Sequence, residues 1–219
     1  MPGTGEGKTP PVLEEVLLEA RAAGFLGPGP LEPQVRHAEG FAVAGRELEG
    51  TPRTARVRVA DLGSGGGLPG LVVAVSWPTA EMVLIEANGR RAAFLRRAVG
   101  RLGLDDRVSV VGRRAEACGR DPAMRCGFDG VVARSFGRPA VVAECAAPLL
   151  KVGGWLVVSE PPGERGGPER WPEDALAELG LEPAGVFVAG YGYQMLRQRQ
   201  ACPDRYPRRD GVPAKQPLF

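Results

Sequence analysis

Histidine and lysine are scarce in this sequence of 219 residues, which holds one histidine, His37, and three lysines. A single imidazole cannot build a His-rich metal site, and its place near the N-terminus leaves no Ser-His-Asp set for nucleophilic catalysis. The four cysteines include no C-x-x-C pair, a spacing that favours reduced thiols over zinc ligands or disulfides. We therefore expect neither a metal nor a disulfide framework.

Long apolar runs and strong net charge are also missing. There is no run of 18 apolar residues, and residues 1–11 lack the apolar core of a signal peptide, so we expect a cytoplasmic protein without a membrane span. A net charge of +2 does not by itself indicate nucleic-acid binding. Subtracting the three lysines from the 28 basic residues leaves 25 arginines. The guanidinium group suits phosphate recognition, but the base composition of the genome is a simpler explanation for this preference for arginine over lysine.

The most informative segment runs from residue 57 to residue 70 and reads Val-Arg-Val-Ala-Asp-Leu-Gly-Ser-Gly-Gly-Gly-Leu-Pro-Gly. An apolar strand leads into a glycine-rich turn and then into an apolar run, an order typical of loops that bind nucleotide cofactors. A second predicted strand ends about twenty residues later at Glu86, where a carboxylate can accept hydrogen bonds from a ribose diol. These features predict a cofactor site, and a tight turn without a ligand is the alternative.

Two cofactors fit this motif. A dinucleotide places its pyrophosphate at the helix N-terminus, and residues 65–70 do form a G-x-G-x-x-G. S-adenosylmethionine carries a sulfonium and no phosphate, and its loops often begin with an acid on the first strand. Asp61 supplies that acid and gives D-x-G-x-G-x-G, which favours S-adenosylmethionine over NAD.

Strands and helices alternate after residue 50, which predicts right-handed crossovers, a parallel sheet and helices on both faces. Two later stretches, 184–189 and 193–200, predict a terminal hairpin. The expected fold is therefore α/β, with a seven-stranded, mostly parallel sheet of the Rossmann-like class I methyltransferase kind. We expect three segments: a helical extension over 1–50, the methyltransferase domain over 51–200 and a basic tail over 201–219. The remaining strands are expected at 57–62, 81–86, 107–111, 128–133 and 154–159. Helices are expected at 11–23, 31–44, 68–76, 89–102, 114–119, 138–150 and 172–179, and Pro33 and Gly40 interrupt the one at 31–44.

Several ordered motifs resemble the glucose-inhibited division protein B family. Besides the glycine loop they are Arg90-Arg-Ala-Ala-Phe-Leu-Arg, Gly112-Arg-Arg-Ala-Glu116, Phe128-Asp-Gly-Val-Val-Ala-Arg134, Pro148-Leu-Leu-Lys-Val-Gly-Gly154 and, in the tail, Arg205-Tyr-Pro-Arg-Arg209. The resemblance implies a class I methyltransferase that uses S-adenosylmethionine to methylate guanine N7 in 16S ribosomal RNA, with that RNA or the small ribosomal subunit as partner.

The resemblance also implies a set of site residues. Glu86 stands at the position of the family's acidic ribose ligand, Ala115 and Glu116 at the border of the adenine, and Arg134 at the mouth of the cofactor site. The full set expected to bind the cofactor is Gly63, Ser64, Gly65, Gly67, Leu68, Glu86, Ala115, Glu116 and Arg134. The tail cations expected to bind the substrate are Arg205, Arg208, Arg209 and Lys215.

Departures from the family pattern surround the substrate opening. The family's early Asn-Leu-Thr element is missing, an acid is lost after His37, and Glu160 replaces a lysine after the fifth strand. Anions such as Glu39 and Glu160 would repel an RNA phosphate. Two alternatives therefore stay open: a methyltransferase of the same fold that acts on a small molecule, and a cofactor-binding partner of RNA or the ribosome without turnover.

Overall fold

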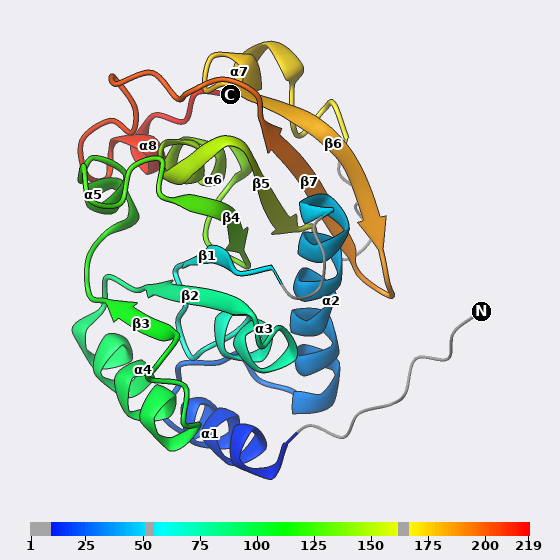
Figure 1. Ribbon diagram of the computed structural model, residues 1–219, viewed down its shortest axis with the longest axis vertical. Helices are drawn as coiled ribbons and strands as arrows, with labels where there is room; N and C mark the ends of the chain where they lie inside the picture. Colours follow the sequence, from blue (N-terminus) through cyan, green and yellow to red (C-terminus); the bar gives the residue numbers. More distant parts are fainter. Residues whose placement is uncertain (1–9, 51–54, 162–166) are drawn as a thin grey trace.

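The computed structural model describes residues 10–50, 55–161 and 167–219, so the polar stretch at 1–9 and much of the loop at 161–170 lie outside the described residues. Its central feature is a seven-stranded sheet with the order β3-β2-β1-β4-β5-β7-β6 (Figure 1). The first five strands are parallel, and β7 pairs antiparallel with both β5 and β6. The strands are β1 (Val57–Leu62), β2 (Ala80–Ile85), β3 (Val108–Val111), β4 (Phe128–Ala133), β5 (Leu150–Ser159), β6 (Leu181–Val188) and β7 (Gly192–Gln198).

This architecture confirms the expected fold class, including the terminal hairpin. Each strand alternates between two hydrophobic cores, so that Val59 and Leu84 face one core while Leu62 and Ile85 face the other. The first core is covered by α1 (Pro11–Ala22), α2 (Leu31–Glu49), α3 (Gly70–Ser76) and α4 (Gly89–Arg101). The second is covered by α5 (Ala115–Gly119), α6 (Pro139–Ala146), the 3₁₀ turn η1 (Ala147–Leu149) and α7 (Glu173–Ala177).

Helix α2 is longer than the sequence predicted. We expected it to end near residue 44 and to be interrupted at Pro33 and Gly40, but it runs without a break from Leu31 to Glu49. Pro33 lies in the first turn, where a missing N–H costs little. Gly40 is required by packing, because a Cβ there would lie 2.0 Å from the Tyr193 hydroxyl. The glycine therefore lets α2 approach β7 closely.

The C-terminal segment is anchored, whereas its sequence showed no periodicity. It runs over α5 and α6 (red in Figure 1) and contains a short helix, α8 (Val212–Lys215). Cys202 and Tyr206 are buried in the second core, and Phe219 packs against it. Residues of α2 belong to the first core and residues of the tail to the second, so neither segment is separated from the sheet by its packing. The division into 1–50, 51–200 and 201–219 therefore stays a proposal.

Candidate active site

The glycine loop joins β1 to α3 at the carboxyl end of the sheet. Gly63 and Gly65 have φ values of +69° and +55°, a region that L side chains rarely adopt. A Cβ at Gly63 would also lie 2.7 Å from the Phe136 ring. The loop is therefore shaped by positive φ and by close contact with the segment after β4, which accounts for the glycines that the motif requires.

Asp61 ends up beneath this loop and fully buried. Its Oδ2 accepts a hydrogen bond of 3.0 Å from the N–H of Gly70, the first residue of α3, while Oδ1 has no partner among the described residues. Burial raises the pKa of this carboxyl to about 7, against the lowering effect of the Ser64 and Gly70 hydrogen bonds. Asp61 therefore occupies the N–H at the start of α3 that a dinucleotide would need for its pyrophosphate, which disfavours NAD.

Glu86 follows β2 and receives two main-chain hydrogen bonds. Its Oε2 accepts from the N–H of Gly65 at 2.9 Å and its Oε1 from the N–H of Asn88 at 2.7 Å. The carboxylate is thereby fixed beside the glycine loop, with further lone pairs that can accept hydrogen bonds. These acceptor positions suit the hydroxyl donors of a ribose diol, and binding of a ribose by Glu86 stays a prediction.

The expected adenine border lies at the start of α5. Ala115 is buried, and Glu116 accepts hydrogen bonds from Arg114 at 2.8 Å and from the N–H of Gly211 at 2.9 Å. Burial alone raises the pKa of Glu116, but the Arg114 and Gly211 hydrogen bonds outweigh it and hold the pKa below its ordinary value. Glu116 thus ties the tail to α5, and its contact with adenine stays a prediction.

Arg134, directly after β4, lies between two hollows. The smaller, about 200 Å³, is lined by the glycine loop together with Phe25 and Gln34 from the N-terminal segment. The larger, about 420 Å³, is lined mainly by residues that follow β4 and β5. Arg134 and Ser135 line both hollows. A group bound at the glycine loop and a second molecule in the larger hollow would therefore meet at these two residues.

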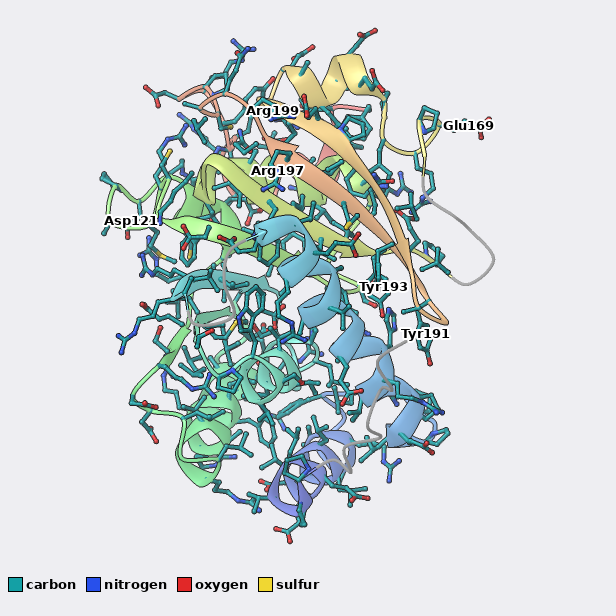
Figure 2. All side chains as sticks on the ribbon, turned by 45° about the vertical axis from the view of Figure 1, so that its right-hand side comes forward. Asp121, Glu169, Tyr191, Tyr193, Arg197 and Arg199 are labelled. Carbon is teal, nitrogen blue, oxygen red and sulfur yellow. The ribbon has the colours of Figure 1, made fainter. Side chains whose placement is uncertain are left out.

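His37, which lines the larger hollow, belongs to an aromatic cluster. The His37 ring stacks on Tyr191 at a centroid distance of 4.2 Å, and the Tyr193 hydroxyl donates to the carbonyl of His37 at 2.7 Å. Figure 2 shows both tyrosines toward the turn of the β6–β7 hairpin, beside α2. Burial, followed by the charge of Arg134, lowers the pKa of His37 to about 4. The imidazole is therefore neutral at pH 7.

Glu160 does not present the free anion that the sequence suggested. Its Oε1 accepts a hydrogen bond from the Trp171 indole at 2.6 Å, and its Oε2 accepts one from Arg170 Nε at 2.8 Å. The carboxylate is 6 % exposed, so its charge is compensated locally and repels phosphate far less than an exposed anion would. The expectation of an exposed anion at position 160 is therefore wrong.

The four tail cations lie in two different settings. Arg208 binds the buried Glu144 through Nε at 2.8 Å and Nη2 at 2.6 Å, and its backbone N–H donates to the same carboxylate. Arg205, Arg209 and Lys215 are exposed. Arg208 therefore holds the tail in place, and RNA binding by all four residues stays a prediction.

Several residues of the two hollows were not singled out from the sequence as site residues. Gln34, Phe136 and Arg170 carry no motif of their own, and they reach the site through α2, the β4–α6 loop and the segment before α7. A useful signal was available only for Phe136, which follows Arg134 at the end of a predicted strand.

The fold and this loop define a class I, S-adenosylmethionine-dependent methyltransferase. A Bacillus cereus O-methyltransferase solved in complex with SAH has the same fold, with a TM-score of 0.62 and 18% identity over 88% of this chain and 92% of that one. That likeness supports the fold alone.

The particular family comes from sequence. The family model GidB, described as rRNA small subunit methyltransferase G, matches residues 47–160. The ribosomal RNA small subunit methyltransferase G of Rubrobacter xylanophilus is 43% identical, with 76% of this chain and 67% of that protein covered. The one from Parasynechococcus marenigrum is 38% identical, with coverage of 77% and 70%. The chain belongs to this family, which confirms the resemblance and the cofactor inferred from the motifs.

Two further features bear on partners. None of the described helices combines the length and apolar character that a bilayer crossing needs. Within residues 10–50, 55–161 and 167–219, no three His, Cys, Asp or Glu side chains are grouped so that they could hold a metal ion.

Proposed function

We propose that this protein transfers the methyl group of S-adenosylmethionine to N7 of a guanine in 16S ribosomal RNA. The observation that carries the proposal is the pair of hollows joined at Arg134 and Ser135, one beside the cofactor loop and one open to an acceptor. The family assignment supplies the class of acceptor.

Guanine N7 is a chemically simple acceptor. It holds a lone pair in the plane of the base and has no proton to lose, so methylation needs no general base. When bound, S-adenosylmethionine supplies a methyl carbon on a sulfonium: the C–S bond breaks, the C–N7 bond forms, and the positive charge moves to the purine. The protein must orient the two reactants and exclude water.

The residues of the site suit that task. Glu86 and the N–H of Gly65 hold the loop in a fixed shape, so the cofactor pocket is formed before binding. His37 is neutral and packed between aromatic rings, where it shapes the acceptor cavity and adds no charge that would oppose the cationic product. Arg134 sits where the two reactants meet and can orient an anionic group of either one.

The acceptor guanine belongs to an accessible RNA segment. N7 lies on the major-groove edge of the base, and that groove is deep and narrow in A-form RNA. The target is therefore a loop or a bulge, in free RNA or in the small ribosomal subunit. A cytoplasmic location is part of the proposal, since that is where such an RNA is found.

The test supplies methyl-labelled S-adenosylmethionine together with 16S RNA, small ribosomal subunits or a metabolite extract. Label should enter RNA or subunits, and nucleoside analysis should yield N7-methylguanosine. Label in the metabolite fraction alone would support the small-molecule alternative. Cofactor binding without transfer to any fraction would support the non-catalytic alternative.

A further inference from the structure

Helix α4 presents a positive surface that the methylation chemistry does not use. Its 13 residues, Gly89–Arg101, include five arginines and no acid. The helix lies at the outside of the molecule beside β3, with α1 next to it (Figure 1). Its apolar side packs into the first core, while Arg90, Arg96 and Arg97 are exposed on the side that faces solvent. We call these three residues the α4 arginine face.

The α4 arginine face differs from other arginines nearby in how its charge is compensated. Arg101, at the end of the same helix, pairs with two carboxylates of α1, and Arg113, after β3, pairs with Asp121 at 2.6 Å. Within the described part of the chain, no ion pair joins a member of the α4 arginine face to a carboxylate. Genome base composition explains arginine in place of lysine, but it does not explain why α4 carries no acid to pair with these cations.

The three side chains flank a narrow strip of the helix surface. Arg90 and Arg97 lie on the same side, two turns and about 10 Å apart, and Arg96 lies on the other side of the exposed, small Ala93. The Arg96 guanidinium extends beside Gly112, where an added Cβ would lie 3.2 Å from Nη2. Arg97 donates to the backbone carbonyl of Ala93 at 3.4 Å, a contact that orients the guanidinium without compensating its charge. A polyanion can therefore approach α4 closely between these cations.

The α4 arginine face starts next to the cofactor site. Arg91, in the first turn of α4, lines the smaller hollow together with the glycine loop and Arg134, and Arg134 also lines the larger hollow. From there α4 extends for about 20 Å. Cations spread along a helix of this length suit an extended polyanion better than a single phosphate group. An RNA strand whose guanine lies in the larger hollow can pass the cofactor loop and continue along α4.

Resting on the proposed function, we propose that the α4 arginine face binds the sugar–phosphate backbone of the ribosomal RNA that flanks the target loop. Contacts of this kind position an RNA without reading its sequence. The α4 arginine face thus supplies affinity and orientation, while the guanine itself is recognised in the acceptor cavity.

The experiment compares Arg90→Ala/Arg97→Ala with the matched control Arg56→Ala/Arg199→Ala, and both double variants lower the net charge by two. Arg56 directly precedes β1 and Arg199 directly follows the antiparallel β7, so the control residues lie at the edge of the sheet opposite the glycine loop. In the α4 variant, KM for 16S RNA or small subunits should rise about five- to tenfold, with kcat and cofactor affinity unchanged, because an exposed phosphate contact is made equally before and during methyl transfer. The log–log dependence of RNA affinity on salt should flatten by about 0.7 for each of the two phosphates.

Two further measurements separate phosphate binding from folding. Arg90→Lys/Arg97→Lys keeps both charges and should retain most of the salt dependence. The thermal midpoint of Arg90→Ala/Arg97→Ala should not fall, because alanine favours a helix at least as well as arginine does.

Four outcomes would overturn the inference. If the α4 variant matches the control in KM and salt dependence, the inference is wrong even though methylation stands. If it loses cofactor affinity or thermal stability in step with RNA affinity, the arginines are structural. If it binds small subunits more weakly but protein-free 16S RNA as well as the wild type does, α4 contacts an acidic ribosomal protein and no RNA backbone. If the wild type methylates no RNA, the proposed function has failed and the inference fails with it.

Discussion

Buried carboxylates anchor both the cofactor loop and the C-terminal tail, but they are satisfied in different ways. On the cofactor side, Asp61 and Glu86 accept hydrogen bonds from the backbone N–H groups of Gly70 and Gly65. On the tail side, Glu144 accepts from the side chain and backbone of Arg208, and Glu116 from Arg114 and Gly211. Main-chain donors thus dominate in one half, and arginines play a large part in the other.

The sequence separation of these partners differs as well. Asp61 and Gly70 are nine residues apart, and Glu86 and Gly65 are 21 apart. Arg208 and Glu144 are 64 apart, and Gly211 and Glu116 are 95 apart. The Gly65 and Gly70 donors belong to a loop whose conformation the local glycines dictate, whereas Arg208 and the Gly211 N–H reach their carboxylates only when the fold brings them near. The cofactor side is therefore encoded locally, and the tail side depends on the complete fold.

The largest expected effect comes from Glu144→Ala, which tests the arginine side of the comparison. The substitution leaves the Arg208 guanidinium and its N–H without their buried partner, a type of change that costs about 3–5 kcal/mol when the remaining charge is fully buried. Because Arg208 is partly exposed, we expect a loss near the lower end, measured as the free energy of unfolding in urea.

Glu182→Ala is the matched control for that experiment. Glu182 also pairs with an arginine, Arg199, but both side chains are exposed, so its loss should cost about 1 kcal/mol or less. Equal losses in the two variants would show that burial of the Glu144 pair contributes nothing extra.

Glu86→Ala tests the backbone side. The change removes an oriented acceptor for the ribose and the partner of the Gly65 N–H, so cofactor affinity should fall by about 1.5–3 kcal/mol in titration calorimetry. Glu81→Ala is the control, since Glu81 lies on the same strand and forms an exposed pair with Arg58. Unchanged affinity in Glu86→Ala, or an equal loss in Glu81→Ala, would refute the ribose assignment.

What the sequence could predict follows the same division. The glycine loop, the place of Glu86 directly after a strand and the succession of strands along the chain were all predicted, because a strand–turn–helix motif is recognisable from its own local sequence. The interpretation of Glu160 as a free anion failed because its pair with Arg170 was not foreseen, and the anchoring of the tail through Glu144 was not foreseen either. The uninterrupted α2 was missed for a similar reason, since Gly40 makes room for Tyr193 from the far end of the chain.

Asp61→Asn tests whether the buried Asp61 carboxyl, which accepts a hydrogen bond from the Gly70 N–H, has a raised pKa in the folded protein. Its pKa rises from 3.8 unfolded to about 7 folded, so its contribution to stability is present below pH 3.8 and is lost as the pH rises toward 7. His37, lowered from 6.5 to about 4, acts oppositely and loses its contribution as the pH falls through that range.

Urea unfolding of the wild type and Asp61→Asn from pH 4 to 7 isolates the carboxyl. The stability of the wild type relative to Asp61→Asn should decline steadily across this range, because every other titrating group is common to both proteins. A difference that stays constant with pH would mean that the pKa of Asp61 is not raised in the folded protein.

The smallest effect is expected at the exposed tail cations, and it separates binding from anchoring. Arg205, Arg209 and Lys215 are exposed, whereas Arg208 is held by Glu144. Deleting the tail would remove buried Tyr206 and destabilise the fold, so the informative variant replaces the three exposed cations with alanine. Its RNA affinity should become less dependent on salt, by about 0.7 in the log–log slope for each cation that had neutralised a phosphate, while cofactor affinity and unfolding stay unchanged.

Arg208→Ala serves as the contrast, since it should lower stability whether or not the tail touches RNA. If the triple variant binds and methylates RNA with the wild-type salt dependence, the tail is purely an anchor. Substrate binding would then fall to the acceptor cavity beside Arg134. In that case the tail substitutions would change the stability of the protein alone, and RNA affinity would not depend on them.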